Sequence, residues 1–462
     1  DGIYDHNSGV DGLTAENYTV PGLFNAKLRV TDNLGAWDVD TIAVLVQSAE
    51  LLVSYSPLEP DVADKITLSI DPPGTPALVE WDLDGDGTYE VDSGSSPSIE
   101  YAPAEPGEHP IAVRLTLASG GSQLLGAVRL LVRGWRQTLA VAGASAFQID
   151  LAEVNGFPAI AYYTSGQGIY YVRALDAQGS AFGTPYLLDG TTAGDVRLLN
   201  VAGHPAVAYP DSTGVVVFVR STDDDGVNWG APVPVGSGVV SHFDLELVNG
   251  RPAVSYVNGG DLYYVRAASA NGSSWGSTVL LDAVDFLAYG SMEVLNGNPA
   301  VLYYSMTDGD SYLIRANDAD GGAWPAGRVS VVPNQLAIDL VVLNGLPATV
   351  YLSPGSPGVL SIKTANDVNG SNWFSSTIIA QIQSGNNLRV AVADGKPVVT
   401  WNANRCFALR GLDSSGGMWA PDEQFGFSSS TYLGREGLAY INDRIAVAYQ
   451  RNNLGLTLAV RY

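Results

Sequence analysis

Apolar and polar residues alternate in short runs along the chain, which is the pattern of half-buried β-strands. Leu28 and Val30 are followed, after an Asp-Asn-Leu-Gly turn, by Ile42, Val44 and Val46. This spacing predicts a strand, a hairpin turn and a second strand. The 52 glycines and 25 prolines also indicate many short strands joined by turns. We therefore expect an all-β protein with almost no helix.

From residue 134 onward the alternation becomes a repeat. One landmark is a tight turn before an apolar strand, and its copies begin at Asn155, Ala202, Asn249, Asn296, Asn344, Asp394 and Asn442. Asn-Gly and Asp-Gly provide the positive φ angles of a tight hairpin. A basic residue closes another strand of each copy, at Arg173, Arg220, Arg266, Arg315, Lys363, Arg410 and Arg461. These seven copies predict a seven-bladed β-propeller.

A third landmark is an aromatic residue after a glycine turn, and it predicts how the ring closes. It occurs at Phe182, Trp229, Trp275, Trp324, Trp373 and Trp419. Trp135 stands at the offset expected for a seventh copy, and the last repeat stops after its third strand at Tyr462. We expect residues 134–140 to supply the fourth strand of the last blade, because closure removes free sheet edges.

The turn before Trp229 runs from Thr222 through Asp224 and Gly226 to Asn228. It is similar to the Asp box of sialidase-like propellers. The other copies look degenerate, with their acidic residues displaced by one position, at Asp176, Asp318, Asp367 and Asp413. Because the repeated basic residue lies shortly before these acids, we expect an ion pair within each blade; the alternative is a basic ring that binds a ligand.

Residues 81–92 read WDLDGDGTYEVD, and the opening DGIYD overlays on the middle of that segment. With the Pro-Gly and Val-Thr-Asp stretches of the first copy, these motifs resemble the PKD family. The second copy departs from the family at Val113–Leu117. The resemblance implies immunoglobulin-like β-sandwiches that serve as extracellular spacers or adhesion modules. We expect the C-terminal part of one module in residues 1–48, a whole module in 49–133 and the propeller in 134–462.

Asp82, Asp84 and Asp86, followed by Gly87, have the spacing with which a calcium loop begins. Calcium prefers carboxylate oxygens, and alternate positions of a loop can supply them. The twelfth position is Ser93 rather than a bidentate glutamate. Calcium is the expected cofactor if there is one; the alternative is a structural turn held by Asp hydrogen bonds.

Charge limits the classes of partner. With 23 basic and 48 acidic residues the formal net charge is -25, which disfavours nucleic acids and anionic lipid surfaces. No apolar run approaches the ~18 residues of a membrane span. Cys406 is the single cysteine, so no internal disulfide can form. An acidic, lysine-poor β-protein is typical of bacterial or archaeal secreted or cell-surface proteins.

An aromatic residue ends the second strand of every copy, on the face where propellers usually bind ligands. These residues are Tyr162, Tyr209, Tyr256, Tyr303, Tyr351, Trp401 and Tyr449. They could stack on sugars or anchor a peptide, or they could pack one blade on the next. The loops that follow vary in sequence and contain the charged candidates Asp308, Asp310, Arg405 and Arg451.

The sequence favours a binding function over catalysis. A sialidase-like site needs an arginine cluster, a Tyr/Glu nucleophile pair and an acidic proton donor, and no such set is evident. His204, His242 and Cys406 lack ligand or nucleophile spacing. We expect an extracellular binding or adhesion protein whose propeller binds a carbohydrate or a protein. The alternatives are a sialidase-like glycan-cleaving enzyme and a self-assembling subunit of a surface layer or filament.

Overall fold

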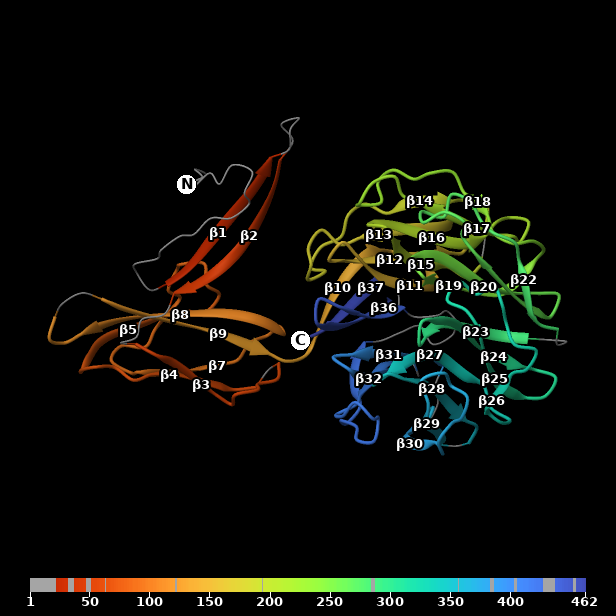
Figure 1. Ribbon diagram of the computed structural model, residues 1–462. Helices are drawn as coiled ribbons and strands as arrows, with labels where there is room; N and C mark the ends of the chain where they lie inside the picture. Colours follow the sequence, from red (N-terminus) through yellow and green to blue (C-terminus); the bar gives the residue numbers. More distant parts are fainter. Residues whose placement is uncertain are drawn as a thin grey trace. The chain divides into compact units, whose positions relative to one another are not determined.

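The protein is described by a computed structural model that covers residues 22–31, 37–46, 51–62, 64–120, 123–192, 194–283, 287–355, 357–382, 386–402, 405–426, 437–451 and 454–462. Within these ranges every regular element is a β-strand and no helix is present, as predicted (Figure 1). Accordingly, the described residues contain no helix of the length and apolarity that crossing a membrane requires. The chain divides into two compact units, Asp1–Arg136 with Tyr462, and Gln137–Arg461.

The first unit begins with an antiparallel hairpin. Strand β1 (Gly22–Thr31) pairs with β2 (Trp37–Val46), with Gly22 opposite Val46 and Thr31 opposite Trp37. This pairing confirms the two predicted strands. The turn itself and the opening DGIYD segment lie outside the described residues. Both strands contact β9 (Leu124–Val132), so the hairpin has a packing partner, which two isolated strands would need in water.

Two sheets share one core in the rest of this unit. The first sheet contains β3 (Val53–Ser56), β4 (Ile66–Ile70) and β7 (Ser98–Tyr101). The second contains, in order, β6 (Val91–Asp92), β5 (Pro76–Asp82), β8 (Gly107–Leu117) and β9. Leu68 from the first sheet and Trp81 and Val113 from the second belong to one buried apolar cluster. The sheets therefore pack face to face, with apolar side chains of both sheets buried between them.

The second unit contains seven four-stranded antiparallel sheets. Their strands, in the order of pairing, are β11 (Ala146–Val154), β12 (Phe157–Thr164), β13 (Gly168–Arg173) and β14 (Tyr186–Asp189); β15 (Arg197–Val201), β16 (His204–Pro210), β17 (Val216–Arg220) and β18 (Val233–Pro234); β19 (Val240–Val248), β20 (Arg251–Asn258), β21 (Asp261–Arg266) and β22 (Val279–Asp282); β23 (Leu287–Leu295), β24 (Asn298–Ser305), β25 (Asp310–Arg315) and β26 (Val329–Val332); β27 (Ala337–Leu343), β28 (Leu346–Ser353), β29 (Gly358–Thr364) and β30 (Thr377–Ile382); β31 (Asn386–Ala393), β32 (Lys396–Asn402), β33 (Cys406–Arg410) and β34 (Glu423–Gly426); and β35 (Gly437–Ile441), β36 (Arg444–Arg451), β37 (Gly455–Arg461) and β10 (Trp135–Ala142).

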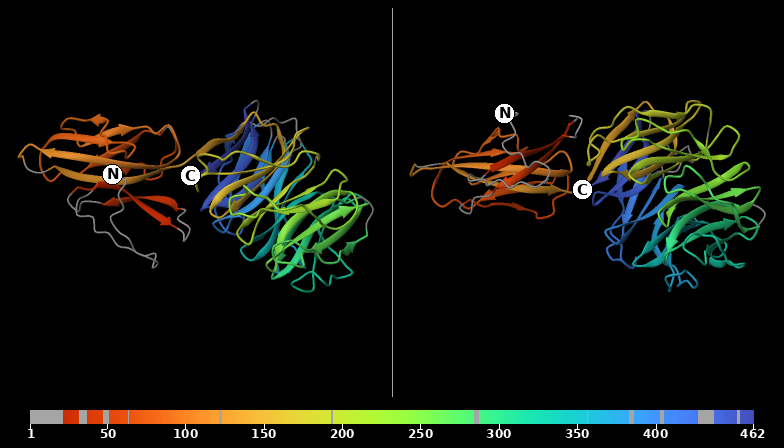
Figure 2. Two further views of the ribbon diagram at one scale, coloured as in Figure 1. Left: turned by 90° about the horizontal axis from the view of Figure 1, so that it is seen from above. Right: turned by 45° about the horizontal axis from the view of Figure 1, so that its top comes forward.

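The first strands of these sheets follow one another in a cycle. β11 contacts β15, which contacts β19, and the series continues through β23, β27 and β31 to β35. β35 contacts β11 in turn, so each first strand has a neighbour on both sides. The views in Figure 1 and Figure 2 show the sheets following one another around this unit in a propeller-like arrangement.

The last sheet is completed by β10, which pairs with β37. Gln137 of β10 donates from Nε2 to the carbonyl oxygen of Phe425 (2.5 Å), and its Oε1 accepts a bond from the Tyr449 hydroxyl (2.9 Å). Just after β10, the amide of Gly143 donates to the carbonyl oxygen of Leu454 (2.8 Å). The predicted pairing of the segment around Trp135 with the end of the chain is thereby confirmed.

The turn between the first and second strands has the predicted backbone. All seven first turn residues have positive φ, from 45° at Asn296 to 52° at Asn155, and the residue that follows each of them is also in the left-handed region. Asparagine tolerates this region, but alanine pays a steric cost for it, and Ala202 has a φ of 50°. Asn155 also donates from Nδ2 to the carbonyl oxygens of Gly203 (2.7 Å) and Asp224 (3.1 Å) in the next sheet.

Candidate functional site

The seven aromatic residues that end the second strands are mostly covered. Tyr162, Tyr209, Tyr256, Tyr303, Trp401 and Tyr449 are 0–3% exposed, and Tyr351 is partly buried. Tyr162 stacks on Tyr170 with ring centroids 5.5 Å apart, and Trp401 stacks on Phe407 at 5.4 Å. These contacts with the third strand of the same sheet favour the packing interpretation.

Contacts with the preceding sheet lead to the same interpretation. Gly236 follows β18, and a Cβ atom at this glycine would lie 2.6 Å from the hydroxyl oxygen of Tyr256 in the next sheet. Gly426 stands in the same relation to Tyr449, at 2.5 Å. The phenol rings therefore fill the space between sheets, and glycines make room for them. Ligand binding by these seven rings stays a prediction.

A different group of polar side chains lies together where two sheets adjoin. We call Asp282, Tyr303, Asp308, Tyr312 and Arg328 the Arg328 cluster. Asp282 ends β22 of one sheet, whereas the other four belong to the strands and loops of the next sheet, β23 to β26. The charged side chains are 22–32% exposed, so solvent reaches them.

The guanidinium of Arg328 connects the two sheets. It donates from one terminal nitrogen to Asp282 Oδ2 (2.9 Å) and from the other to Asp308 Oδ2 (2.7 Å). Its central carbon lies 3.9 Å from the centroid of the Tyr312 ring. Tyr303 donates its hydroxyl hydrogen to Asp282, and Tyr312 donates to Asp308 (2.8 Å). Each side chain is thus fixed by at least one other member of the cluster.

The pKa shifts of Arg328, Tyr312 and Tyr303 agree with the charges that these contacts imply. Burial opposes the charged form of Arg328, but hydrogen bonds to Tyr303 and Asp282 outweigh this effect, so the pKa of Arg328 is raised. Burial, followed by its hydrogen bond to Asp308, raises the pKa of Tyr312 to about 12. Both phenols are neutral donors at physiological pH, since burial raises the pKa of Tyr303 as well.

The structure brings together only some of the predicted charged candidates. Asp308 belongs to the Arg328 cluster, and Asp310 lies beside it, accepting bonds from Tyr312 (3.4 Å) and from the amide of Asn334 (2.8 Å). Arg405 donates to Gln424 instead (2.6 Å). The sequence interpretation missed Arg328, which precedes the fourth strand rather than following the second.

In the hairpin before Trp229, the carboxylate that accepts the turn hydrogen bonds belongs to Asp223 rather than to Asp224, the acid aligned with the Asp box. Asp223 accepts bonds from the amides of Gly226 (2.7 Å), Val227 (2.9 Å) and Asn228 (2.7 Å). These bonds outweigh burial and lower the pKa of Asp223 to about 2. The same position before the aromatic residue is used by Asp176, Asp318, Asp367 and Asp413, so these copies are not displaced.

The repeated basic residues bear out the predicted ion pair within a sheet in one case, since Arg410 pairs with Glu423 of its own sheet (2.7 Å), but two others pair across sheets. Arg173 pairs with Asp225 of the next sheet (2.7 Å) rather than with an acid of its own sheet. Arg266 likewise pairs with Asp320 of the next sheet (3.2 Å), and it donates to the carbonyl oxygen of Val248 in its own (2.9 Å). The guanidinium groups of Arg220, Arg266 and Arg315 also donate to backbone carbonyl oxygens, which favours a structural role.

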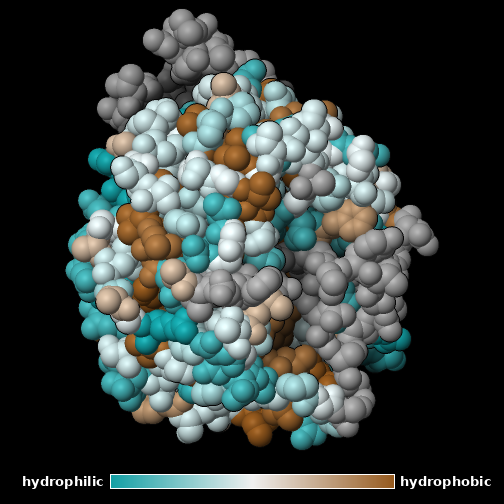
Figure 3. Space-filling view, turned by 90° about the vertical axis from the view of Figure 1, so that its right-hand side faces the viewer, coloured by the Kyte–Doolittle hydropathy of each residue, from teal (hydrophilic) through white to brown (hydrophobic). Residues whose placement is uncertain are grey.

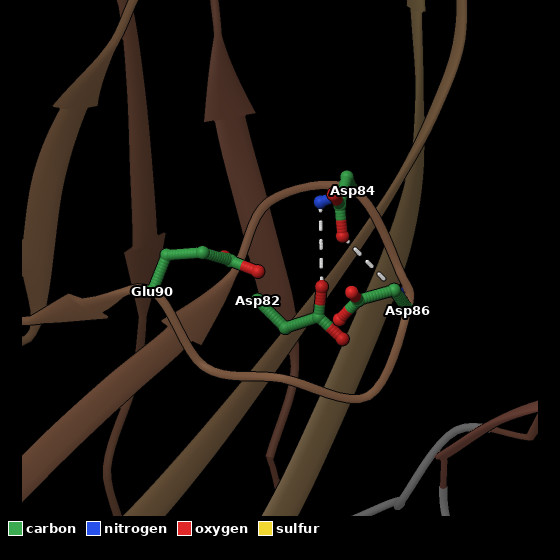
Figure 4. A group of neighbouring side chains, drawn as sticks. All are labelled: Asp82, Asp84, Asp86 and Glu90. Atoms are coloured by element: carbon green, nitrogen blue, oxygen red, sulfur yellow. Dashed lines mark hydrogen bonds between the residues drawn. The ribbon is translucent and has the colours of Figure 1, made fainter.

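The acidic loop after β5 is a second candidate site. One carboxylate oxygen from each of Asp82, Asp84, Asp86 and Glu90 lies within 4.8 Å of the others, and Figure 4 shows the four side chains converging inside the loop. Asp82 is 2% exposed, while the other three are exposed. Glu90 was not part of the predicted metal set, although it lies only a few residues beyond Asp86.

Backbone amides of the loop fix the position of the Asp82 carboxylate. The amides of Gly85 (2.6 Å) and Gly87 (3.0 Å) donate to the carboxylate of Asp82. Both glycines have positive φ, 74° and 90°, which lets the chain turn tightly around the carboxylate. Ser93, the twelfth position, points elsewhere, since its hydroxyl accepts a bond from Trp81 Nε1 (3.2 Å). Burial raises the pKa of Asp82, an effect that these amides only partly offset.

A ring of polar side chains on the first strands was not predicted. We call it the inner ring; its members occupy the position five residues before each hairpin turn: Asp150, Arg197, Asp244, Ser291, Asp339 and Arg389, with Gly437 at the seventh place. Asp150 accepts a bond from the amide of Leu198 in the next sheet (2.8 Å). Asp244 does the same for Met292 (2.8 Å), and it binds Arg197 Nε (2.9 Å). The ring therefore links neighbouring first strands.

The inner ring carries more acid than base. Glu246 and Glu293 lie on the adjacent strands β19 and β23, two residues beyond ring positions. Burial, then the nearby charge of Glu293, raises the pKa of Glu246 to about 8. Burial likewise raises the pKa of Asp150 to about 6, against the opposing charges of Arg197 and Arg389. Carboxyl groups enclosed in this way favour their protonated form.

Comparison with known proteins gives likenesses to solved structures alone. No family model matches the chain, and no curated protein matches it. The structure of BBS1N in complex with ARL6DN is 11% identical, with 71% of this chain and 96% of that chain covered and a TM-score of 0.47. The Dos1 propeller is 10% identical over 96% of this chain and 95% of its own, with a TM-score of 0.44. The NanB sialidase of Streptococcus pneumoniae is 11% identical over 89% and 92%, with a TM-score of 0.39.

Proposed function

We propose that residues 134–462 form a seven-bladed β-propeller closed by β10, that residues 49–133 form a PKD-like module and that residues 1–48 belong to part of another. The seven four-stranded sheets and the cyclic contacts of their first strands support the propeller. The shared core of the two sheets around Trp81 supports an immunoglobulin-like sandwich. The acidic composition supports a secreted or cell-surface location, with the modules as spacers.

On this scaffold the protein binds a glycan at the Arg328 cluster without cleaving it. The observation that carries this proposal is the fixed, solvent-accessible arrangement of two carboxylates, a guanidinium and a phenol around Arg328. Sugar hydroxyls are donors and acceptors at once, and they need partners whose directions are already set. Arg328 lies over one face of the Tyr312 ring, and the hydrogen-bonding groups around the guanidinium provide the directional partners of this site.

The same contacts argue against glycoside hydrolysis. Cleavage by two carboxyl groups needs one of them to hold a proton for the leaving oxygen. Asp282 and Asp308 both accept hydrogen bonds from the same guanidinium, which makes neither a ready proton donor. The site is therefore better suited to holding a sugar than to cleaving one.

A glycan array probed with the whole chain tests this proposal. Replacement of Arg328 by glutamine should weaken binding at least tenfold, because both carboxylates lose their shared partner. Arg129→Gln is the matched control, since it removes an exposed arginine that pairs with Glu108 (3.6 Å) in the other unit. Equal binding by Arg328→Gln and the wild-type protein, or no binding of any glycan, would refute the proposal.

The acidic loop supports a second proposal, that Asp82, Asp84, Asp86 and Glu90 bind calcium. Four carboxylate oxygens within 4.8 Å of one another are the hard ligands that calcium prefers. The ion would lock the loop between β5 and β6 and so stiffen the module that carries the propeller. Extracellular sites of this kind bind calcium with Kd values of about 10⁻⁴ to 10⁻³ M.

Calorimetric titration of the whole chain, freed of metal by a chelator, measures this affinity directly. Asp84→Asn should abolish the binding, whereas Asp71→Asn, which changes an exposed aspartate of the same unit, should leave it intact. Heat release that persists in Asp84→Asn would place the calcium elsewhere, and its absence in the wild-type protein would reject the proposal.

A further inference from the structure

The charge of the Arg328 cluster sets the kind of glycan that can bind there. We infer that this site selects neutral or amino sugars and rejects anionic ones, such as sialic and uronic acids. The inference rests on the proposed glycan binding at this site. It follows from how the single guanidinium is used and from the carboxylates around it.

Recognition of a sugar carboxylate usually requires a free guanidinium fork, which offers two parallel hydrogen bonds. Arg328 already donates one hydrogen bond from each terminal nitrogen, to Asp282 (2.9 Å) and to Asp308 (2.7 Å). One face of the guanidinium lies over the Tyr312 ring at 3.9 Å. A ligand carboxylate that bonds to both terminal nitrogens would therefore compete with the two aspartates for the guanidinium and tend to displace one of them.

The surrounding charge opposes such a displacement. The two carboxylates of Asp282 and Asp308 and the one guanidinium of Arg328 sum to one net negative charge. Asp310, which contacts Tyr312 (3.4 Å), adds a second negative charge. The groups are only 22–32% exposed, so solvent screens them less than it screens charges in open water. An anionic ligand meets like charges at close range, whereas an ammonium group meets unlike ones.

The remaining polar groups fit a ligand that is rich in hydroxyls. Tyr303 and Tyr312 each direct a neutral phenol at an aspartate, and the carboxylates retain lone pairs that can accept hydrogen bonds. Sugar hydroxyls can donate to those lone pairs without bringing in charge. An amino group at the same place would add a charge-assisted hydrogen bond.

Matched glycans test this selectivity in the whole chain. Oligomers of glucose, glucosamine and glucuronic acid differ at single positions, so their affinities can be compared at ~0.15 M salt. We expect the glucuronic acid oligomer to bind at least tenfold more weakly than the other two, and the difference to shrink in ~1 M salt. Stronger binding of the anionic oligomer would overturn the inference and leave glycan binding standing. No binding to any glycan of the array would overturn both.

Two variants locate the effect. Asp308→Asn frees one edge of the guanidinium and removes a negative charge, and Asp310→Asn removes a charge without touching Arg328. Each should raise the affinity for the anionic oligomer relative to the neutral one, with a greater change for Asp308→Asn. An unchanged ratio in both folded variants would place the selectivity elsewhere and refute the inference. Thermal unfolding identifies a variant that fails to fold, and the other then gives the answer.

Discussion

Replacement of Ala202 by asparagine should stabilise the protein. Ala202 begins the hairpin turn of the second sheet with a φ of 50°, a conformation that costs alanine about 1 kcal/mol or more. Asparagine stands at this position in five of the seven turns, and it tolerates positive φ. The substitution should therefore relieve strain without altering the hairpin.

New hydrogen bonds should add to this gain. Asn155 in the preceding sheet donates to the carbonyl oxygens of Gly203 (2.7 Å) and Asp224 (3.1 Å) of the sheet that follows it. Asn442 of the last sheet makes the same pair of bonds to the first sheet, to the carbonyl oxygens of Gly156 (2.6 Å) and Ala177 (2.9 Å). An asparagine at 202 would meet the equivalent carbonyls of the third sheet. Each net hydrogen bond is worth about 1 kcal/mol, so the two bonds and the relieved strain together bring the total to ~3 kcal/mol.

Thermal unfolding by calorimetry measures the effect. For a unit of this size ~3 kcal/mol corresponds to a rise in Tm of about 4 °C. Ala202→Gly relieves the strain but adds no side-chain bond, so it separates the two contributions, and Asn155→Ala should lower Tm by a similar amount. The reasoning fails if Ala202→Asn unfolds at or below the wild-type temperature while Asn155→Ala is destabilised.

Three further perturbations address the inner ring and the hairpins. The pKa of Glu246 in the folded protein is about 8 against an ordinary 4.5, so the stability that its protonated form provides is lost as pH rises from about 4.5 to 8. Glu246→Gln should therefore raise Tm at pH 8 and have no such effect near pH 5. The opposite order would show that folding favours the carboxylate. Gly437→Ala should destabilise the fold by several kcal/mol, because the added Cβ would lie 2.6 Å from the Cβ of Leu151. An unchanged denaturant unfolding curve would mean that the contact between the last and the first sheet can adjust. Asp223→Ala should lower the free energy of unfolding by about 2 kcal/mol, and Asp224→Ala by less than half of that, as measured by urea unfolding. The reverse order would contradict the assignment of Asp223 as the acceptor in the hairpin.

Much of the fold could be predicted because its signals are local. An Asn-Gly pair takes positive φ wherever it occurs, so the hairpins at Asn155 and Asn249 could be located before any tertiary contact was known. The pairing of the segment around Trp135 with the end of the chain is distant in sequence, yet repetition made it predictable, since one strand was missing from the last copy. The number of strands in each copy was therefore enough to predict this long-range contact.

The candidate site was harder to predict because its members come from separate strands. Asp282 and Arg328 belong to different sheets, and neither follows a second strand, where ligand residues were sought. The predicted aromatic positions were correct as a pattern, but the pattern alone could not separate a ring that faces solvent from one that faces the next sheet. Gly236 and Gly426, which accommodate two of the phenols, gave no sign of that role in the sequence.

The sequence by itself determined the strands, their hairpins and the number of repeats, because these depend on alternation and on φ preferences within a few residues. Tertiary structure alone decided which charges meet. Arg197 binds Asp244 (2.9 Å) and Arg328 binds Asp282 (2.9 Å) because neighbouring sheets bring them together, although each pair is more than forty residues apart in the chain. Electrostatic interactions depend on distance and burial, and neither quantity can be read from the order of residues.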